Sequence, residues 1–212
     1  MRAVLPGRRS VRLGGKVYDR DQLTALASLA LVALALLHEP GTADPSGASE
    51  VAETAAAAPS ARAEAVLEVI QAEVGYQEGP RNANKYGDAY GMPNQPWCMQ
   101  LVWWAGQQAG VGDLIPRTAY TPTAAQWYRD RGQWSTEPRV GSLVFFDWPG
   151  DGKDRISHVG LVVAVEDGAI VTYEGNTRAQ PGGDQSEGDG VYERRRPLGP
   201  SVVGFGHPAY PT

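Results

Sequence analysis

The chain is short of cysteine: its 212 residues contain one, Cys98. A single cysteine excludes a disulfide within the chain and leaves any metal site without the thiolates that structural zinc requires. A lone thiol is in most proteins a small buried hydrophobic residue. Only the residues around Cys98 can therefore give it another role.

An excess of positive charge is also lacking. The net charge is -5, which argues against a broad surface for nucleic acid, so we expect no nucleic-acid partner. The basic residues that do cluster lie within residues 2–20 and at Arg194–Arg196. We interpret the second cluster as the solvated end of a strand.

The apolar run at residues 23–37 falls short of a transmembrane helix. It has 15 residues without a charge or a proline, whereas a membrane span needs about 20. The basic residues ahead of it and the small residues behind it are typical of a secretory signal. An uncleaved membrane anchor and a buried helix are the alternatives. We assign residues 1–38 to one segment, which joins the basic residues and the apolar run and serves as a signal peptide or a membrane anchor.

A linker and one folded domain follow. Residues 39–61 are rich in Pro, Ala, Gly, Ser and Glu and contain no large apolar residue beyond Val51. Such a stretch buries too little surface to offset the entropy of ordering it. The folded domain is then assigned to residues 62–212, and it shows no internal repeat.

The folded domain begins with helical periodicity and ends with short β-branched runs. Helices are predicted over residues 63–74, 98–109 and 123–131, and strands over 142–147, 159–165, 169–174 and 202–205. Helices first and an antiparallel sheet second predict an α+β domain, with the N-terminal helices packed on the sheet.

Cys98, His158 and a polar residue near Glu174 form a candidate catalytic set. Cys98 stands directly at the start of a helical pattern, where the helix dipole favours a thiolate. His158 opens a strand, and the turn at residues 167–168 brings the chain back beside it. Glu174 or Asn176 can then accept a hydrogen bond from the second ring nitrogen of His158. A thiol, an imidazole and an orienting group in this order are typical of cysteine acyl-transfer enzymes.

Each of these residues also has a structural interpretation. Taken alone, Cys98 is a core thiol and His158 a satisfied strand residue, and we assign such structural roles to His38 and His207. The turn at Glu174–Asn176 is consistent with ordinary turn chemistry. The joint occurrence on the expected elements favours catalysis.

Two further features leave alternatives open. Asn82, Asn84, Tyr86 and Asp88 alternate before Cys98 and suggest either a Ca²⁺ loop or a substrate-edge loop. All six tryptophans fall between residues 97 and 148 and serve either the core or an aromatic groove.

Several motifs in order resemble one known family, the CHAP domain of cysteine- and histidine-dependent amidohydrolases/peptidases. The resemblance spans about residues 62–208. It is carried by Val-Gly-Tyr-Gln-Glu-Gly (74–79), Asn-Lys-Tyr-Gly (84–87), Tyr-Gly (90–91), Pro-Trp-Cys (96–98), Gly-Ser-Leu-Val-Phe-Phe-Asp-Trp (141–148), Ser-His-Val-Gly (157–160) and Glu-Gly-Asn (174–176).

The resemblance implies a papain-like α+β fold and hydrolysis of amide bonds in peptidoglycan peptides. Cys98 would be the nucleophile, His158 the general base and acid, Glu174 the group that orients His158, and Asn176 an accessory polar residue. The backbone N–H of Cys98 and the side chain of Gln95 are the candidate oxyanion donors.

Trp97 and Trp148 are the candidate groove residues. Family members often carry Asp where this chain has Ser142 and Ser157, which leaves the catalytic set unchanged.

The expected enzyme needs no organic cofactor and no metal, apart from the Ca²⁺ alternative. Its partner is a peptidoglycan stem or cross-bridge peptide, and it contacts a membrane only if the N-terminal apolar segment stays uncleaved. We expect a monomer that is secreted to the cell wall, with a membrane-anchored protein or a phage-encoded lysin as alternatives.

The cleaved amide is left open between N-acetylmuramoyl-L-alanine amidase and endopeptidase. The alternative functions are an NlpC-type endopeptidase, a protein-directed cysteine protease or toxin, and a non-catalytic cell-wall-binding module.

Overall fold

The fold is taken from a computed structural model that describes residues 10–13, 16–19, 59–148, 155–182 and 184–211. The chain divides into two compact units, Met1–Glu53 and Thr54–Thr212. In the first unit, β1 (Ser10–Leu13) pairs antiparallel with β2 (Lys16–Asp19). The apolar run at residues 23–37 lies outside the described residues, as does the linker up to residue 58. The assignment of these segments therefore stays a prediction.

The second unit begins with helices. These are α2 (Ala61–Gln71), the short α3 (Lys85–Tyr90), α4 (Cys98–Gln108), the 3-10 turn η1 (Gly112–Leu114) and α5 (Thr121–Asp130). The hydroxyl of Ser60 accepts a hydrogen bond from the N–H of Ala63 and so fixes the start of α2. No helix within the described ranges has the length and apolar character that crossing a membrane requires.

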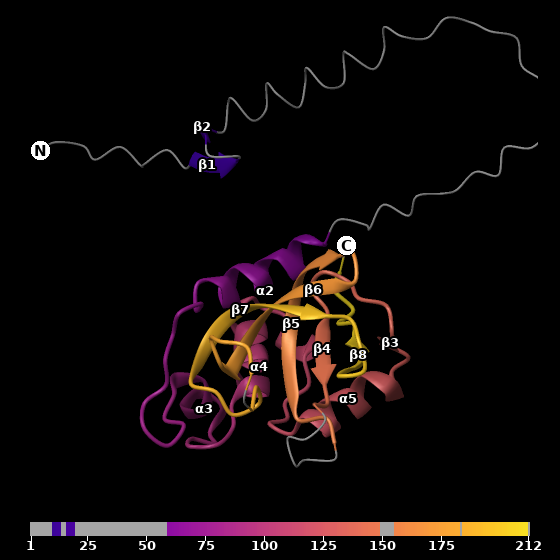
Figure 1. The fold of residues 1–212 in the computed structure, drawn as a ribbon. Helices are drawn as coiled ribbons and strands as arrows, with labels where there is room; N and C mark the ends of the chain where they lie inside the picture. The colour runs from indigo at the N-terminus through magenta and orange to yellow at the C-terminus, as the bar shows by residue number, and fades with distance from the viewer. Residues whose placement is uncertain (1–9, 14–15, 20–58, 149–154, 183, 212) are drawn as a thin grey trace, which may run out of the picture. The chain divides into compact units, whose positions relative to one another are not determined.

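A six-stranded antiparallel sheet follows the helices, in the order β3-β8-β4-β5-β6-β7. Its strands are β3 (Trp134–Ser135), β4 (Leu143–Phe146), β5 (His158–Glu166), β6 (Ala169–Thr177), β7 (Gly190–Pro197) and β8 (Val202–Gly206). Figure 1 shows α4 running behind the sheet, with α3 and α5 near its lower end. The predicted α+β class, with helices packed on an antiparallel sheet, is confirmed.

The two faces of the sheet belong to two apolar clusters, because side chains alternate along each strand. Leu143, Phe145 and Leu161 face the helices and pack with α2, α4 and α5 in the main core. Val144 and Phe146 point to the other face and join a smaller cluster with neighbouring strands. The first residue of β5, His158, lies on that second face.

Periodicity located most elements to within two residues, but it missed β1 and β2 in the first unit and α3, η1, β3 and β7 in the second. The helices predicted at residues 98–109 and 123–131 appear as α4 and α5. The strand predicted at residues 159–165 appears as β5. The missed strand β7 covers the outer side of β6 and brings Arg194–Arg196 into the sheet.

Candidate active site

Cys98 is the first residue of α4. The residue before it, Trp97, provides no side-chain cap, so its side chain does not occupy the first N–H groups of the helix. Cys98 is 3% exposed, and it lines a pocket of about 260 Å³. The predicted placement of the thiol at a helix N-terminus agrees with this geometry.

Trp97 does not contribute to the pocket wall among the described residues, and its prediction as a groove residue is wrong. Its side chain is fully buried, and its ring stacks on Tyr86 with centroids 5.2 Å apart. The indole N–H donates a hydrogen bond to Glu78. The residue directly before Cys98 points back into the core, where it anchors the start of α4.

His158 is fully buried and faces Glu174 across the β5–β6 pair. Its Nε2 lies 3.1 Å from Oε2 of Glu174. Its Nδ1 is buried and makes no hydrogen bond of ordinary geometry within the described part of the chain. Nδ1 is therefore the nitrogen left for the thiol of Cys98, and His158 interacts with Cys98 on one side and with Glu174 on the other.

Both neighbours favour the protonated form of His158. Burial alone lowers the pKa of the imidazole, because an imidazolium loses its hydration. Hydrogen bonding and charge interactions with Cys98 and Glu174 outweigh that effect and raise the pKa of His158 to about 9. At neutral pH the imidazole is therefore positively charged.

Gly160 makes room for the contact between Glu174 and His158. A Cβ atom at position 160 would lie 2.7 Å from Cγ of Glu174 and 3.3 Å from the carbonyl oxygen of Tyr173. The side chain of Glu174 crosses the backbone of β5 at this position to reach His158. The glycine of the Ser-His-Val-Gly motif thus has a steric role.

Glu174 is held from the far side by Arg196, a residue that sequence reasoning assigned to a solvated strand end. That interpretation is wrong for Arg196, which is buried and bonded to both carboxylate oxygens. Burial alone would raise the pKa of Glu174. Hydrogen bonds and charge from Arg196 and His158 instead hold that pKa well below its usual range. Glu174 is therefore ionised at neutral pH.

Asn176 occupies a different environment from Glu174. Pairing between β6 and β7 shifts after Glu174, and Asn176 has a left-handed φ of 57°. Its amide nitrogen donates to the carbonyl oxygen of Ser186 over 2.7 Å. Within the described residues the hydrogen bond of His158 goes to Glu174 and not to Asn176, so an accessory role for Asn176 stays a prediction.

The pocket beside Cys98 carries both charged and apolar groups. Gln95 lines it as expected, together with exposed Tyr120 and Arg155. The remaining lining residues are Met92, Pro96, Ala119, Thr121, Ile156, Ser157, Ser186 and Glu187.

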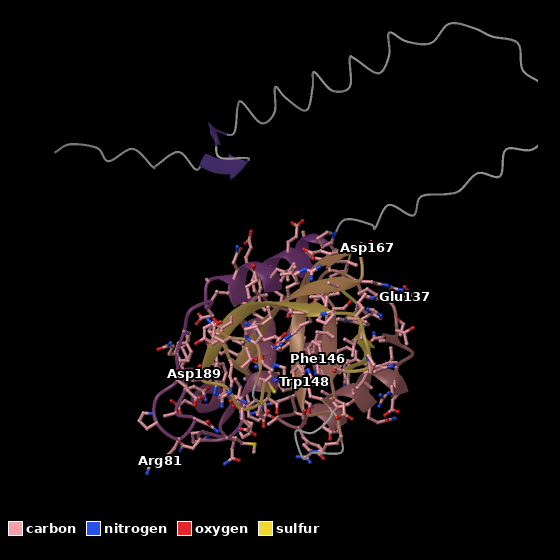
Figure 2. The ribbon with its side chains drawn as sticks, in the orientation of Figure 1. Arg81, Glu137, Phe146, Trp148, Asp167 and Asp189 are labelled. Carbon is pink, nitrogen blue, oxygen red and sulfur yellow. The ribbon has the colours of Figure 1, made fainter. Side chains whose placement is uncertain are left out.

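Trp148 covers the buried side of the site and does not line this pocket among the described residues. Its ring stacks on Phe146 with centroids 4.9 Å apart. Figure 2 labels the two residues next to each other near the middle of the second unit. The ring also lies 5.3 Å from that of His158. Trp148 therefore shields the imidazole, and its predicted contact with substrate is not supported by this geometry.

The loop suggested for Ca²⁺ uses its oxygens within the fold. Oδ1 of Asn84 accepts the N–H of Gly87 over 2.7 Å and caps α3. The hydroxyl of Tyr86 donates to Glu73 over 2.7 Å. Among the described residues there is no cluster of three or more His, Cys, Asp or Glu side chains that suits a metal ion.

His207 has the structural role that was expected. Its Nε2 lies 2.7 Å from the hydroxyl of Ser135, and its Nδ1 lies 2.7 Å from the hydroxyl of Ser142. Burial, with a smaller contribution from Arg139, lowers the pKa of His207 to about 4. Ser142, one of the two positions where the family often has Asp, thus joins β4 to the C-terminal segment.

Comparison with known families gives one match: residues 71–176 fit the CHAP domain. No curated protein matches the chain.

Solved structures similar to this chain include three proteins. Ly7917 is 15% identical and aligns over 69% of this chain and 62% of its own, at a TM-score of 0.43. A Staphylococcus aureus protein described as similar to lipoprotein, of the NLP/P60 family, is 15% identical, with coverages of 75% and 45% and a TM-score of 0.43. The peptidoglycan hydrolase RipB from Mycobacterium tuberculosis is 21% identical, with coverages of 87% and 79% and a TM-score of 0.39.

The chain spans less than two thirds of the length of Ly7917 and of the Staphylococcus aureus protein. TM-scores below 0.5 are too low to assign a function, so the family assignment depends on the CHAP match alone.

Proposed function

The chain belongs to the CHAP domain family, whose match covers half of it, and we propose that it is a peptidoglycan hydrolase that cleaves an amide bond of the wall peptide through Cys98. The observation that carries this proposal is that His158 contacts both Cys98 and Glu174, and that Cys98 lines a pocket. A thiol next to a protonated imidazole is the arrangement that generates a thiolate at neutral pH.

The first chemical step forms a thioester. The sulfur of Cys98 attacks the carbonyl carbon of the substrate amide, and a carbon–sulfur bond forms. As the tetrahedral intermediate collapses, the carbon–nitrogen bond breaks and the leaving amine takes a proton from Nδ1 of His158. General acid–base assistance of this kind contributes about 10²–10⁴-fold to the rate.

The second step releases the acid product. His158, now neutral, accepts a proton from water while the water oxygen attacks the thioester carbon. The carbon–sulfur bond then breaks and restores the thiolate–imidazolium pair. The uncapped N–H groups at the start of α4 are well placed to donate to the oxyanion in both steps, and Gln95 is a second candidate donor.

The pocket chemistry suits a peptide with charged ends. Arg155 supplies a cation, and it lies over the ring of Tyr120 at 5.8 Å. Glu187 supplies an anion at the same pocket. We infer that a peptidoglycan stem or cross-bridge peptide binds here, with the choice between amidase and endopeptidase set by which amide reaches Cys98.

We infer a place of action outside the cytoplasm, because the proposed substrate is the cell wall. We propose that the N-terminal segment directs export or anchors the protein, and that the enzyme works as a monomer. A protein substrate would be cleaved by the same catalytic residues. The experiment must therefore distinguish a wall hydrolase from a protein-directed protease.

The test compares the full chain with its Cys98→Ala variant on purified peptidoglycan sacculi. We expect the parent to clear the suspension and the variant to be inactive, because the alanine has no nucleophile. Mass spectrometry of the released fragments identifies the bond: a free L-alanine amino end indicates amidase cleavage, and shortened stem peptides indicate endopeptidase cleavage.

A variant that clears sacculi as fast as the parent would exclude Cys98 as the nucleophile. If neither protein releases fragments while the thiol of the parent still reacts with iodoacetamide at neutral pH, the wall is not the substrate. Casein and denatured proteins are then the substrates to compare.

A further inference from the structure

Arg196 connects the end of β7 to the carboxylate of Glu174. Its Nε donates to Oε1 of Glu174 over 2.8 Å, and its Nη2 donates to Oε2 over 2.5 Å. Two parallel hydrogen bonds of this kind fix a carboxylate in orientation as well as in charge. Further donation to Gln185 over 3.1 Å and to Thr177 over 3.3 Å fixes the guanidinium itself.

The two hydrogen bonds from Arg196 to Glu174 form a clamp that fixes both carboxylate oxygens of Glu174. Oε1 also accepts the hydroxyl hydrogen of Thr172 over 2.6 Å. Oε2, which Arg196 holds, is the same oxygen that faces Nε2 of His158. The position of the atom that orients the imidazole is therefore set by β7 and β6 together.

The two side chains of this clamp are almost completely buried. Arg196 is 8% exposed and Glu174 is 1% exposed. The guanidinium lies 5.2 Å from the ring of Trp148 and 5.8 Å from that of Phe146, which cover it. A buried carboxylate without a cation would take up a proton, so the charge of Glu174 depends on its partners.

We propose that Arg196 is a positioning residue, which keeps Glu174 ionised and aimed at His158 and thereby sets the pH at which Cys98 becomes reactive. The inference rests on the proposed role of Cys98 as the nucleophile. Arg196 touches neither the thiol nor the pocket, and it acts through Glu174 and His158.

Among the residues that the structure describes, three further ionisable groups surround the clamp. His158 approaches Glu174 from β5, and Cys98 approaches His158 from α4. Arg194 lies on the same strand as Arg196, and its pKa is lowered by burial and by Arg196 while Glu174 counteracts them. Loss of the Arg196 cation weakens the field that favours a thiolate, and protonation of Glu174 would weaken it further. Both effects move the onset of Cys98 reactivity to higher pH.

The test measures alkylation of the thiol by iodoacetamide in the full chain across pH 4 to 9, by intact mass. Cys98 is the only cysteine of the sequence, so the label reports on one site. We expect Arg196→Gln to raise the midpoint of the acid limb by about one pH unit, the lower end of the effect of a nearby opposite charge. Below the midpoint this corresponds to about tenfold slower labelling.

Two matched variants complete the series. Arg196→Lys keeps the charge but not the two-point contact, so its midpoint should lie between those of the parent and Arg196→Gln. Arg195→Gln is the control, because Arg195 is exposed and pairs with Glu166 at the surface over 2.7 Å. Its midpoint should equal that of the parent.

An unchanged midpoint in Arg196→Gln, even with a lower melting temperature, would show that Arg196 is only structural. If that variant does not fold, Arg196→Lys decides: a raised midpoint supports the proposal and an unchanged midpoint overturns it. A parent thiol without any acid limb would overturn it as well. The assay uses no wall substrate, so a protein that fails on sacculi but shows the shift loses the proposed function and keeps this inference.

Discussion

At the scale of single residues, Gly160 gives the most direct test of the site geometry. Its backbone leaves the space through which Glu174 reaches His158, and an added Cβ would lie 2.7 Å from Cγ of Glu174. We predict that Gly160→Ala displaces the carboxylate and lowers Cys98-dependent hydrolysis at least about tenfold, since acid–base assistance contributes about 10²–10⁴-fold. Rates on sacculi and the melting temperature are the measurements.

Gly199→Ala is the control for this prediction, because nothing lies within 4 Å of a Cβ built at position 199. It should keep the activity of the parent. Full activity in Gly160→Ala, at an unchanged melting temperature, would mean that the contact between Glu174 and His158 tolerates displacement and does not limit the rate.

The residues that the sequence predicted together are those whose chemistry is visible in the motif. Cys98, His158 and Glu174 were found because a thiol, an imidazole and a carboxylate have few other reasons to occur in this order. Arg196 was missed because three consecutive arginines hide the alternation of a strand. Trp97 was misplaced because its position beside Cys98 says nothing about the direction of its side chain.

At the scale of elements, α3 depends on its cap more than on its periodicity. The helix has six residues, and Asn84 caps it through Oδ1 while Nδ2 donates to the carbonyl oxygen of Asn82 over 2.7 Å. We predict that Asn84→Ala lowers the free energy of unfolding by about 1 kcal/mol, the usual effect of losing an N-cap. Urea unfolding followed by tryptophan fluorescence measures it.

The same experiment separates the cap from the Ca²⁺ alternative. Asn84→Asp should recover only part of the loss, because aspartate keeps the capping oxygen but lacks the Nδ2 donor that bonds to Asn82. Both variants are measured with calcium and with chelator. A parent that gains stability from millimolar calcium, and an Asn84→Ala variant that does not, would support the Ca²⁺ loop over the cap.

Elements with strong periodicity were predictable and elements held by single contacts were not. α4 and β5 bury a regular face, and hydrophobic spacing located both of them. α3 is too short to show a period. The sequence of β7 resembles a polar loop, because one of its buried positions is the charged residue Arg196 and only another, Val191, is apolar. Its place in the sheet follows only from its pairing with β6.

At the scale of the whole molecule, two histidines with opposite shifts predict a maximum of stability near pH 6.5. His207 has a folded pKa of about 4, below its unfolded value. The unfolded state therefore binds more protons as pH falls from 6.5 to 4, and stability is lost on that side. His158 has a folded pKa of about 9, so its contribution is complete below pH 6.5 and is lost as pH rises to 9.

Thermal unfolding of the full chain between pH 4.5 and 9 measures this dependence. All six tryptophans lie between residues 97 and 148, so their fluorescence follows the unit that carries the site. His207→Gln should flatten the acid side alone, and His158→Gln should flatten the alkaline side alone. If the melting temperature falls equally steeply with decreasing pH in the parent and in His207→Gln, protonation of carboxylates and not of His207 causes the loss of stability at acid pH. The hydrogen bonds of His207 to Ser135 and Ser142 would then matter for geometry and not for titration.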